Sequence, residues 1–234
     1  MTLSGLRIDL KKLSNPKKAA FLLKYFKTGK GDYGEGDIFI GITVPVLRKI
    51  ARKYHDLPLK DVKLLLKSKI HEERFVALEN LTYRYEKGND NLKKEIFEFY
   101  FDNIGAINNW DLVDTSAPYI VGHYLIDKDK SVLYKLAKSN NIWERRISII
   151  SSQYFIKNNK FDETIRIAEI LLSDEHDLIH KAVGWMLREI GNKKINIEEK
   201  FLIKNYKKMP RTMLRYAIEK FPEKRRLQFL RGEI

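Results

Sequence analysis

The sequence predicts an all-α protein, an α-solenoid in which antiparallel helix pairs stack into one curved domain with a concave basic face. After Val44, apolar residues recur at positions i, i+3, i+4 and i+7, and alternating β-branched runs are few. Five segments, which begin at Glu73, Asn109, Glu144, Ile179 and Arg211, can be laid over one another, with starts 36, 35, 35 and 32 residues apart. A period in the thirties built from helix pairs is typical of a solenoid, because each pair buries its apolar face only against its neighbours.

The first 55 residues differ from the repeats. A helix is expected around residues 16–27, and another opens near Val44 and Pro45. Between them, four glycines within residues 29–37 predict a loop. We therefore expect a single domain over residues 1–234, with N-terminal helices and a glycine-rich loop in 1–55 and helical repeats in 56–234.

Glycine, asparagine and proline punctuate the repeats and predict where their helices end. The turn residues include Gly88, Asn140, Asn158, Gly191 and Pro210. The resulting helix pairs are 61–70 with 73–87, 91–104 with 108–125, 130–139 with 143–157, 161–173 with 177–190, and 197–207 with 211–221.

Composition narrows the function. With 44% hydrophobic residues the chain can bury a core, and the absence of cysteine excludes disulfides, thiolate nucleophiles and cysteine-ligated metal centres. Neither a membrane-spanning stretch nor an export signal is expected, which predicts a cytoplasmic protein with no membrane partner.

The chain is strongly basic. Its 45 Lys and Arg against 31 Asp and Glu give a net charge of +14, and residues 204–231 alone hold ten cations and two anions. Such an excess favours a polyanion, with nucleic acid as the leading candidate, although lysine also serves solubility alone.

The second helix of each pair carries the candidate site residues. Trp110 and Asp114 are four residues apart and share a helical face. The next repeats place Arg145 and Arg146 beside a tryptophan, and then Lys181, Trp185 and Arg188, on equivalent helices. A row of indole rings and guanidinium groups would suit a nucleic-acid backbone. The alternative is that these residues serve the fold rather than a ligand. Tryptophan commonly packs between repeats, and Asp114 could form an ion pair with Arg146 or act as a negative charge at a helix N-terminus.

Other patterns indicate no site. The histidines form no zinc motif and are predicted to be solvated surface; they are His55, His71, His123, His176 and His180. Asp32, Glu35 and Asp37 in the glycine-rich loop do not match a calcium loop, so no metal is expected. Phosphate-binding and serine-nucleophile motifs are absent as well.

Three ordered segments carry a family resemblance: residues 108–118 (NNWDLVDTSAP), 141–147 (NIWERRI) and 179–189 (IHKAVGWMLRE). Together with residues 25–27, 39–48 and 209–217, they resemble the AlkD-type DNA alkylation-repair glycosylases, which are HEAT-like repeat proteins, over nearly the whole chain. The resemblance implies a DNA glycosylase. Its expected substrate is double-stranded DNA with positively charged N3- or N7-alkylated purines, released by hydrolysis of the N-glycosidic bond in base excision repair. A monofunctional mechanism without cofactor or metal is expected, because no lysine replaces Asp114 as nucleophile, and a monomer is expected, because a solenoid with a basic groove needs no partner subunit.

Site residues follow from the resemblance by position. Asp114 corresponds to the catalytic carboxylate, Trp110 and Trp185 to the rings that pack against the deoxyribose, and Arg146 to the group that holds the adjacent backbone. Supporting DNA contacts are expected from six further residues: Tyr25, Arg145, Lys181, Arg188, Arg211 and Arg215. Two other functions stay open, namely a non-catalytic HEAT-repeat protein that binds damaged or branched DNA, and a solenoid that binds an acidic protein.

Overall fold

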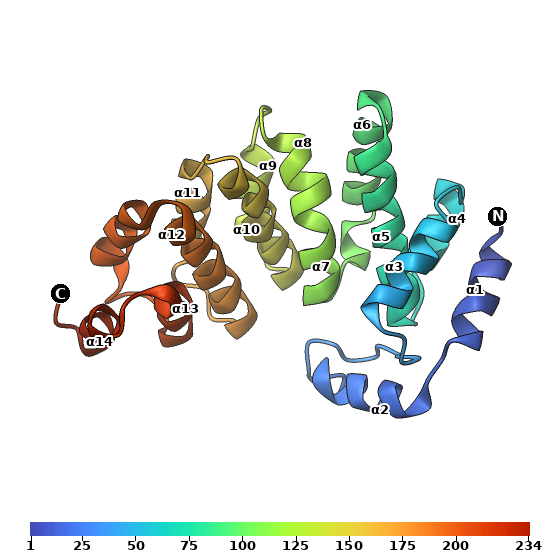
Figure 1. The fold of residues 1–234 in the computed structure, drawn as a ribbon, viewed down its shortest axis with the longest axis horizontal. Helices are drawn as coiled ribbons and strands as arrows, with labels where there is room; N and C mark the ends of the chain where they lie inside the picture. Colours follow the sequence, from blue (N-terminus) through green and yellow to red (C-terminus); the bar gives the residue numbers. More distant parts are fainter. The chain divides into compact units, whose positions relative to one another are not determined.

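The computed structural model describes residues 1–234 and confirms the predicted fold class. The chain is 71% helical and has no strand, apart from one isolated parallel bridge between Ile38 and Ile70. It divides into two compact units, Met1–Ser116 and Ala117–Ile234 (Figure 1). None of the helices combines the length and apolar character that a membrane-spanning segment needs.

Unit 1 is built around one long helix, α5, whose side chains are mostly buried. Helices α3, α4 and α6 pack against α5, and α1 packs against α3. Phe75, Val76, Leu78 and Leu81 of α5 are at most 1% exposed and form the centre of this core. The helices of unit 1 are α1 (Leu3–Lys12), α2 (Pro16–Tyr25), α3 (Val44–Lys53), α4 (Leu59–Leu66), α5 (His71–Lys87), α6 (Asp90–Asp102) and α7 (Trp110–Ala117), with a 3-10 turn at Ile104–Ala106.

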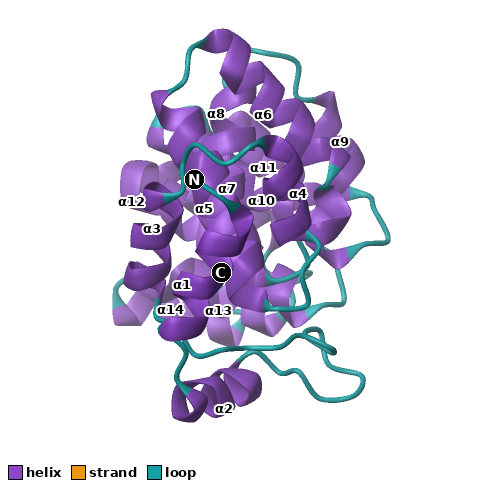
Figure 2. Ribbon diagram, turned by 90° about the vertical axis from the view of Figure 1, so that its right-hand side faces the viewer, coloured by secondary structure: helices purple, strands orange, loops and turns teal.

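Helix α2 is the exception in unit 1, because it buries none of its side chains. Its start is fixed by Asn15, whose side chain accepts a hydrogen bond from the backbone N–H of Lys18, and by proline at the first helical position. In both views α2 lies at one end of the unit, joined to α3 by a long loop (Figures 1 and 2). That loop contains residues 29–37 and forms no helix, as the glycines predict.

Unit 2 is organised around α10, which packs against α9, α11, α12 and a π-helical turn. Isoleucines 147, 149 and 150 and Phe155 of α10 are fully buried. Helix α12 also packs against α11 and α13. The elements are the π-helical turn Pro118–Gly122, α8 (His123–Leu125), α9 (Ser131–Ala137), α10 (Ile142–Lys157), α11 (Asp162–Ile170), α12 (Asp177–Asn205), α13 (Arg211–Ala217), a 3-10 turn at Ile218–Lys220 and α14 (Glu223–Arg231).

Three local features differ from the sequence prediction. Helices α1 and α14 lie outside the predicted pairs. The break expected at Gly191 lies instead at Lys194, where φ is −148° and ψ is 82° inside α12. Gly191 serves close packing, since a Cβ at this position would overlap the carboxylate of Glu198. The glycine therefore marks a contact between the two arms of α12 rather than the end of a helix.

Candidate functional site

The first turn of α7 carries Trp110 and, one turn later, Asp114. The indole of Trp110 stacks on Phe26 with ring centroids 5.1 Å apart and an interplanar angle of 11°. Tyr25 meets the same indole edge-on at 6.0 Å. Trp110 and Asp114 are both half-buried. Unit 1 thus brings Tyr25 against Trp110, one turn from Asp114, and the roles that the resemblance gives these residues stay predictions.

A buried charge network lies directly behind Trp110. The imidazole of His71 contacts Asp111 Oδ2 through Nε2 at 2.7 Å and Asp37 Oδ2 through Nδ1 at 3.2 Å. Arg74 completes the network with an ion pair of 2.7 Å to Asp37 Oδ1, and Asn109 donates to Asp37 Oδ2 at 3.3 Å. The network joins α5, the loop before α3 and the first turn of α7.

The protonation of this network follows from its contacts. Burial alone lowers the pKa of His71, but the carboxylates of Asp111 and Asp37 outweigh it, so that this pKa lies above the ordinary 6.5. Burial likewise raises the pKa of Asp37, and the hydrogen bond from His71 and the charge of Arg74 bring it below 3.8. When His71 is protonated, two carboxylates face an imidazolium and a guanidinium, and the buried charges balance.

The adjacent residue of α5, Glu72, anchors the loop that precedes α3. Its carboxylate accepts hydrogen bonds from the backbone N–H groups of Ile40, Gly41 and Ile42, the one from Gly41 at 2.7 Å. Gly41 has φ of +84°, and a Cβ there would overlap the carbonyl oxygen of Asn15, so the position requires glycine. The loop is therefore held against both α5 and the start of α2.

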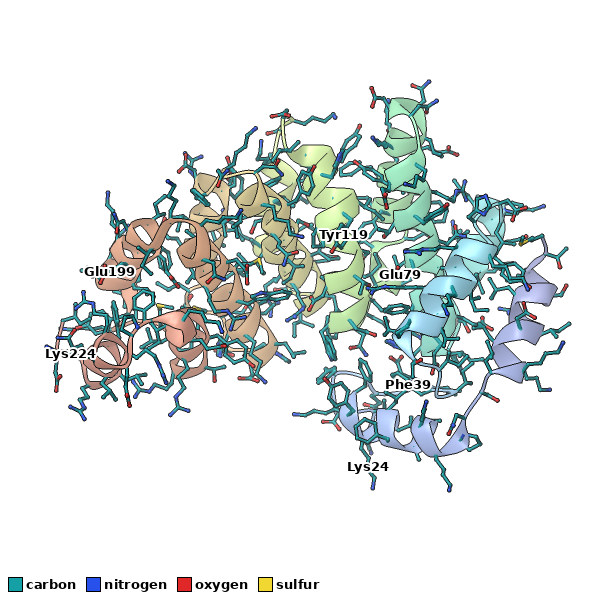
Figure 3. The ribbon with its side chains drawn as sticks, in the orientation of Figure 1. Lys24, Phe39, Glu79, Tyr119, Glu199 and Lys224 are labelled. Carbon is teal, nitrogen blue, oxygen red and sulfur yellow. The ribbon has the colours of Figure 1, made fainter.

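Helix α2 presents aromatic and basic side chains to solvent beside Trp110. Phe21 is 65% exposed and Tyr25 is 55% exposed, and their rings stack with centroids 6.0 Å apart. Lys24 points away from the rest of unit 1, whereas Phe39 lies in the loop between α2 and α3 (Figure 3). Exposed aromatic rings on a helix with no buried residue are unusual for a packing role and suit contact with a partner.

In unit 2, the predicted arginines of α10 tie neighbouring elements together. Arg145 pairs with Asp174 at 2.6 Å, and that carboxylate is only 5% exposed. Arg146 is itself 5% exposed and donates to the carbonyl oxygen of Leu178, in the first turn of α12, at 2.6 Å. Both guanidinium groups therefore help to fix the start of α12 against α10.

The predicted cations of α12 both take part in ion pairs with carboxylates that are more than half exposed, although the Arg188 side chain itself is only 18% exposed. Lys181 pairs with Asp177 at 2.7 Å, one turn away on the same helix, and both side chains are at least 40% exposed. Arg188 pairs with Glu219, whose side chain is 51% exposed. Pairs of this kind contribute only about 0–1 kcal/mol, so a phosphate group can replace the carboxylate at little cost.

The three tryptophans differ in burial. Trp143, on α10, is 7% exposed and belongs to the core, as the packing alternative predicts. Trp185, on α12, is half-buried, and its indole N–H donates to Glu189 at 3.1 Å. Trp110 and Trp185 thus keep part of their ring surface accessible, and they are the two that the resemblance places at the deoxyribose.

The two remaining predicted DNA contacts lie on α13. Arg211 donates to the carbonyl oxygen of Leu230 at 2.7 Å and so links α13 to α14. Arg215 is exposed. No group of three or more His, Asp or Glu side chains is arranged to hold a metal ion.

Sequence reasoning missed the buried network. The prediction that the histidines are solvated is wrong for His71, which is 2% exposed. A carboxylate on each side supplies the compensation that a buried imidazolium requires. In the sequence, Asp37 falls only in a loop that does not match a metal site, and no motif singles out Asp111. No spacing rule connects the three residues, because His71 is 34 residues from Asp37 and 40 residues from Asp111 along the chain.

Comparison with known proteins identifies the family. The sequence model of a family described as DNA alkylation repair enzyme matches residues 6–221. No curated protein sequence matches the chain.

Solved structures share the fold at low identity. A predicted DNA alkylation repair enzyme from Enterococcus faecalis has a TM-score of 0.69 and 16% identity, over 90% of this chain and 97% of that one. AlkD2 from Streptococcus mutans has a TM-score of 0.55 and 19% identity, over 94% and 97%. The protein smu.31 from Streptococcus mutans UA159 has a TM-score of 0.51 and 21% identity, over 94% and 99%. The family match covers most of the chain, and the protein therefore belongs to the DNA alkylation repair enzyme family.

Proposed function

We propose that this protein is a DNA glycosylase that excises N3- and N7-alkylated purines from duplex DNA by hydrolysis of the N-glycosidic bond. The observation that carries the proposal is the α7 start, where Trp110 stacks on Phe26 and Asp114 follows one turn later in a chain of the DNA alkylation repair family. The partner is double-stranded DNA that contains the alkylated base.

The chemistry of the substrate explains why so few groups are needed. Alkylation at N3 or N7 makes the purine a cationic leaving group, so no general acid has to protonate it. What remains is to stabilise the oxocarbenium-like sugar and to position water. The Asp114 carboxylate supplies the negative charge for both tasks. The indole faces of Trp110 and Trp185 add cation–π attraction of about 0.5–2 kcal/mol each.

The other predicted residues bind the backbone. Lys181 and Arg188 exchange their exposed carboxylate partners for phosphates. Arg146 is assigned to the backbone beside the lesion, with Arg145 next to it on α10; because Arg146 is 5% exposed and bonded to Leu178, this contact requires its side chain to turn outward when DNA binds. Tyr25 contributes its exposed ring, and Arg211 and Arg215 contribute charge from α13. The proposed reaction uses water and side chains of this one chain, and the proposal includes neither a cofactor nor a second subunit.

The direct test is release of N7-methylguanine from a methylated duplex, with EDTA present. The variant is Asp114→Asn, and the matched control is Asp102→Asn, an exposed aspartate at the end of α6. We expect Asp114→Asn to lower the single-turnover rate by at least about 100-fold, because an electrostatic group at the reacting centre is removed. The control should match the wild type.

Each outcome has a distinct meaning. Release that survives Asp114→Asn would remove this carboxylate from the mechanism. Salt-dependent binding of the duplex with no release by the wild-type protein would overturn the glycosylase proposal and favour a non-catalytic DNA-binding protein. Circular dichroism of Asp114→Asn guards against loss of folding as the cause of inactivity.

A further inference from the structure

A small groove lies between α13 and α14 in unit 2. Its volume is about 310 Å³, and it is lined by Arg215 of α13, Ile218 of the following 3-10 turn, and Arg226 and Leu230 of α14. Ile218 is 1% exposed, so the groove has an apolar floor with one guanidinium group contributed by each helix.

The two groove arginines differ from their neighbours. Arg211 donates to Leu230, and Arg225 pairs with Glu199 at 2.7 Å. Arg215 and Arg226 are exposed, and neither guanidinium makes a hydrogen bond, ion pair or ring contact within the protein. Two unpaired guanidinium groups that line one groove are both available to donate to an anion placed between them.

The groove walls are fixed before any ligand arrives. Phe229 of α14 is 1% exposed and packs edge-on against Tyr206 and Phe221 with ring centroids 5.6 and 5.8 Å apart. The Arg225–Glu199 pair joins α14 to α12. Figure 3 labels Glu199 on α12 and Lys224, the residue before Arg225, on α14. Arg215 and Arg226 therefore lie on two helices, α13 and α14, whose relative position is fixed by contacts within unit 2.

We propose that this groove binds one phosphodiester of the DNA backbone, with Arg215 and Arg226 on the phosphate oxygens and the sugar against Ile218 and Leu230. The inference rests on the proposed function for its partner and adds Arg226 and a defined phosphate position to it. A phosphate offers oxygens to two guanidinium groups at once, and the deoxyribose supplies the apolar surface that a free inorganic anion lacks. The net charge of +8 over residues 204–231 attracts the polyanion to this end of the chain.

The test compares charge-matched variants in binding to an undamaged duplex by fluorescence anisotropy. The groove variants are Arg215→Gln and Arg226→Gln, and the control is Arg231→Gln, which removes the same charge from the end of α14 without lining the groove. We expect each groove variant to weaken binding about five-fold at about 0.15 M salt, the effect of losing one phosphate contact. The double variant should lower the slope of log Kd against log salt by about one, because both arginines hold a single phosphate. The control should change Kd by less than about two-fold, the effect of long-range charge alone.

Two results would overturn the inference. In the first, the groove variants and Arg231→Gln bind the duplex equally well, which would show that the groove arginines contribute only long-range charge and no specific phosphate contact. In the second, the double variant leaves the slope of log Kd against log salt unchanged, which would show that the two arginines hold no phosphate of the duplex. Because the duplex carries no lesion, failure of base release does not affect this measurement, and a correct glycosylase proposal does not guarantee its success.

Discussion

Replacement of His71 by glutamine tests the buried network behind Trp110. Asp111 and Asp37 keep side-chain exposures of 11% and 7%, so loss of the imidazolium leaves two buried carboxylates with the single guanidinium of Arg74. Removal of one partner from a buried pair costs about 3–5 kcal/mol. A Coulomb estimate agrees, because two charges about 4 Å apart at an effective dielectric constant of about 20 interact by about 4 kcal/mol.

The dependence on pH has a definite sign. The pKa of His71 is raised above 6.5 in the folded protein, so its contribution to stability is fully present below pH 6.5 and is lost as the pH rises through the raised value. The free energy of unfolding of His71→Gln should therefore fall furthest below that of the wild type at about pH 6, and the gap should narrow in alkaline solution by about 1.4 kcal/mol for each unit of pKa shift.

The assay is urea unfolding followed by circular dichroism at a series of pH values. If the two units unfold in separate transitions, the loss belongs to the transition of unit 1. The variant Asp111→Asn, alone and combined with His71→Gln, completes a double-mutant cycle that measures the coupling of the two residues. A penalty below about 1 kcal/mol, or a penalty independent of pH, would refute the buried ion pair.

Three further predictions concern separate parts of the chain. Burial raises the pKa of Glu198 to about 8, so the wild type loses stability relative to Glu198→Gln as the pH rises. The stability difference measured by urea unfolding should grow by roughly 3 kcal/mol from about pH 5 to about pH 8. A difference that does not change with pH would contradict a raised pKa for Glu198. Glu72→Gln should weaken three backbone hydrogen bonds and lower the free energy of unfolding by about 1–3 kcal/mol. Limited proteolysis should then cleave the loop before α3 faster than in the wild type. An unchanged cleavage rate would show that Glu72 does not anchor this loop. Phe21→Ala should leave the Tm within about 2 °C, because α2 buries nothing, yet weaken duplex binding by anisotropy by about 1 kcal/mol or more; unaltered affinity would remove α2 from the interface.

Helical periodicity and turn residues predict most of unit 1 and unit 2, because both signals are local. Glycine is ambiguous, since it ends a helix in some places and permits close packing in others. Gly191 belongs to the second kind, and only the position of Glu198 reveals it. Helix α14 lies outside the repeat that guided the prediction, and its single fully buried residue, Phe229, gives almost no periodic signal.

The candidate site divides in the same way. Trp110 and Asp114 were predictable because they lie one turn apart on one helix. The groups that hold Trp110 in place, His71 and Asp37, come from a different helix and from a glycine-rich loop, and their pairing depends on tertiary contacts alone. The ion-pair partners of the arginines could not be predicted either. Nothing in the sequence distinguishes Arg145, which pairs with a buried carboxylate, from Arg215, which is unpaired.

The network also explains why the backbone beside Trp110 is held in place although the neighbouring α2 buries none of its own side chains. His71 ties the start of α7 to α5, and Asp37 and Glu72 tie the loop before α3 to the same helix. Trp110 and Asp114 therefore have a fixed backbone beneath them, whereas α2 has no buried side chain to restrain it. The proposed function predicts that substitutions in α2 change DNA affinity, because its exposed rings lie beside Trp110, and that substitutions in the network change the single-turnover rate at saturating duplex, because the network positions the helix that carries Trp110 and Asp114.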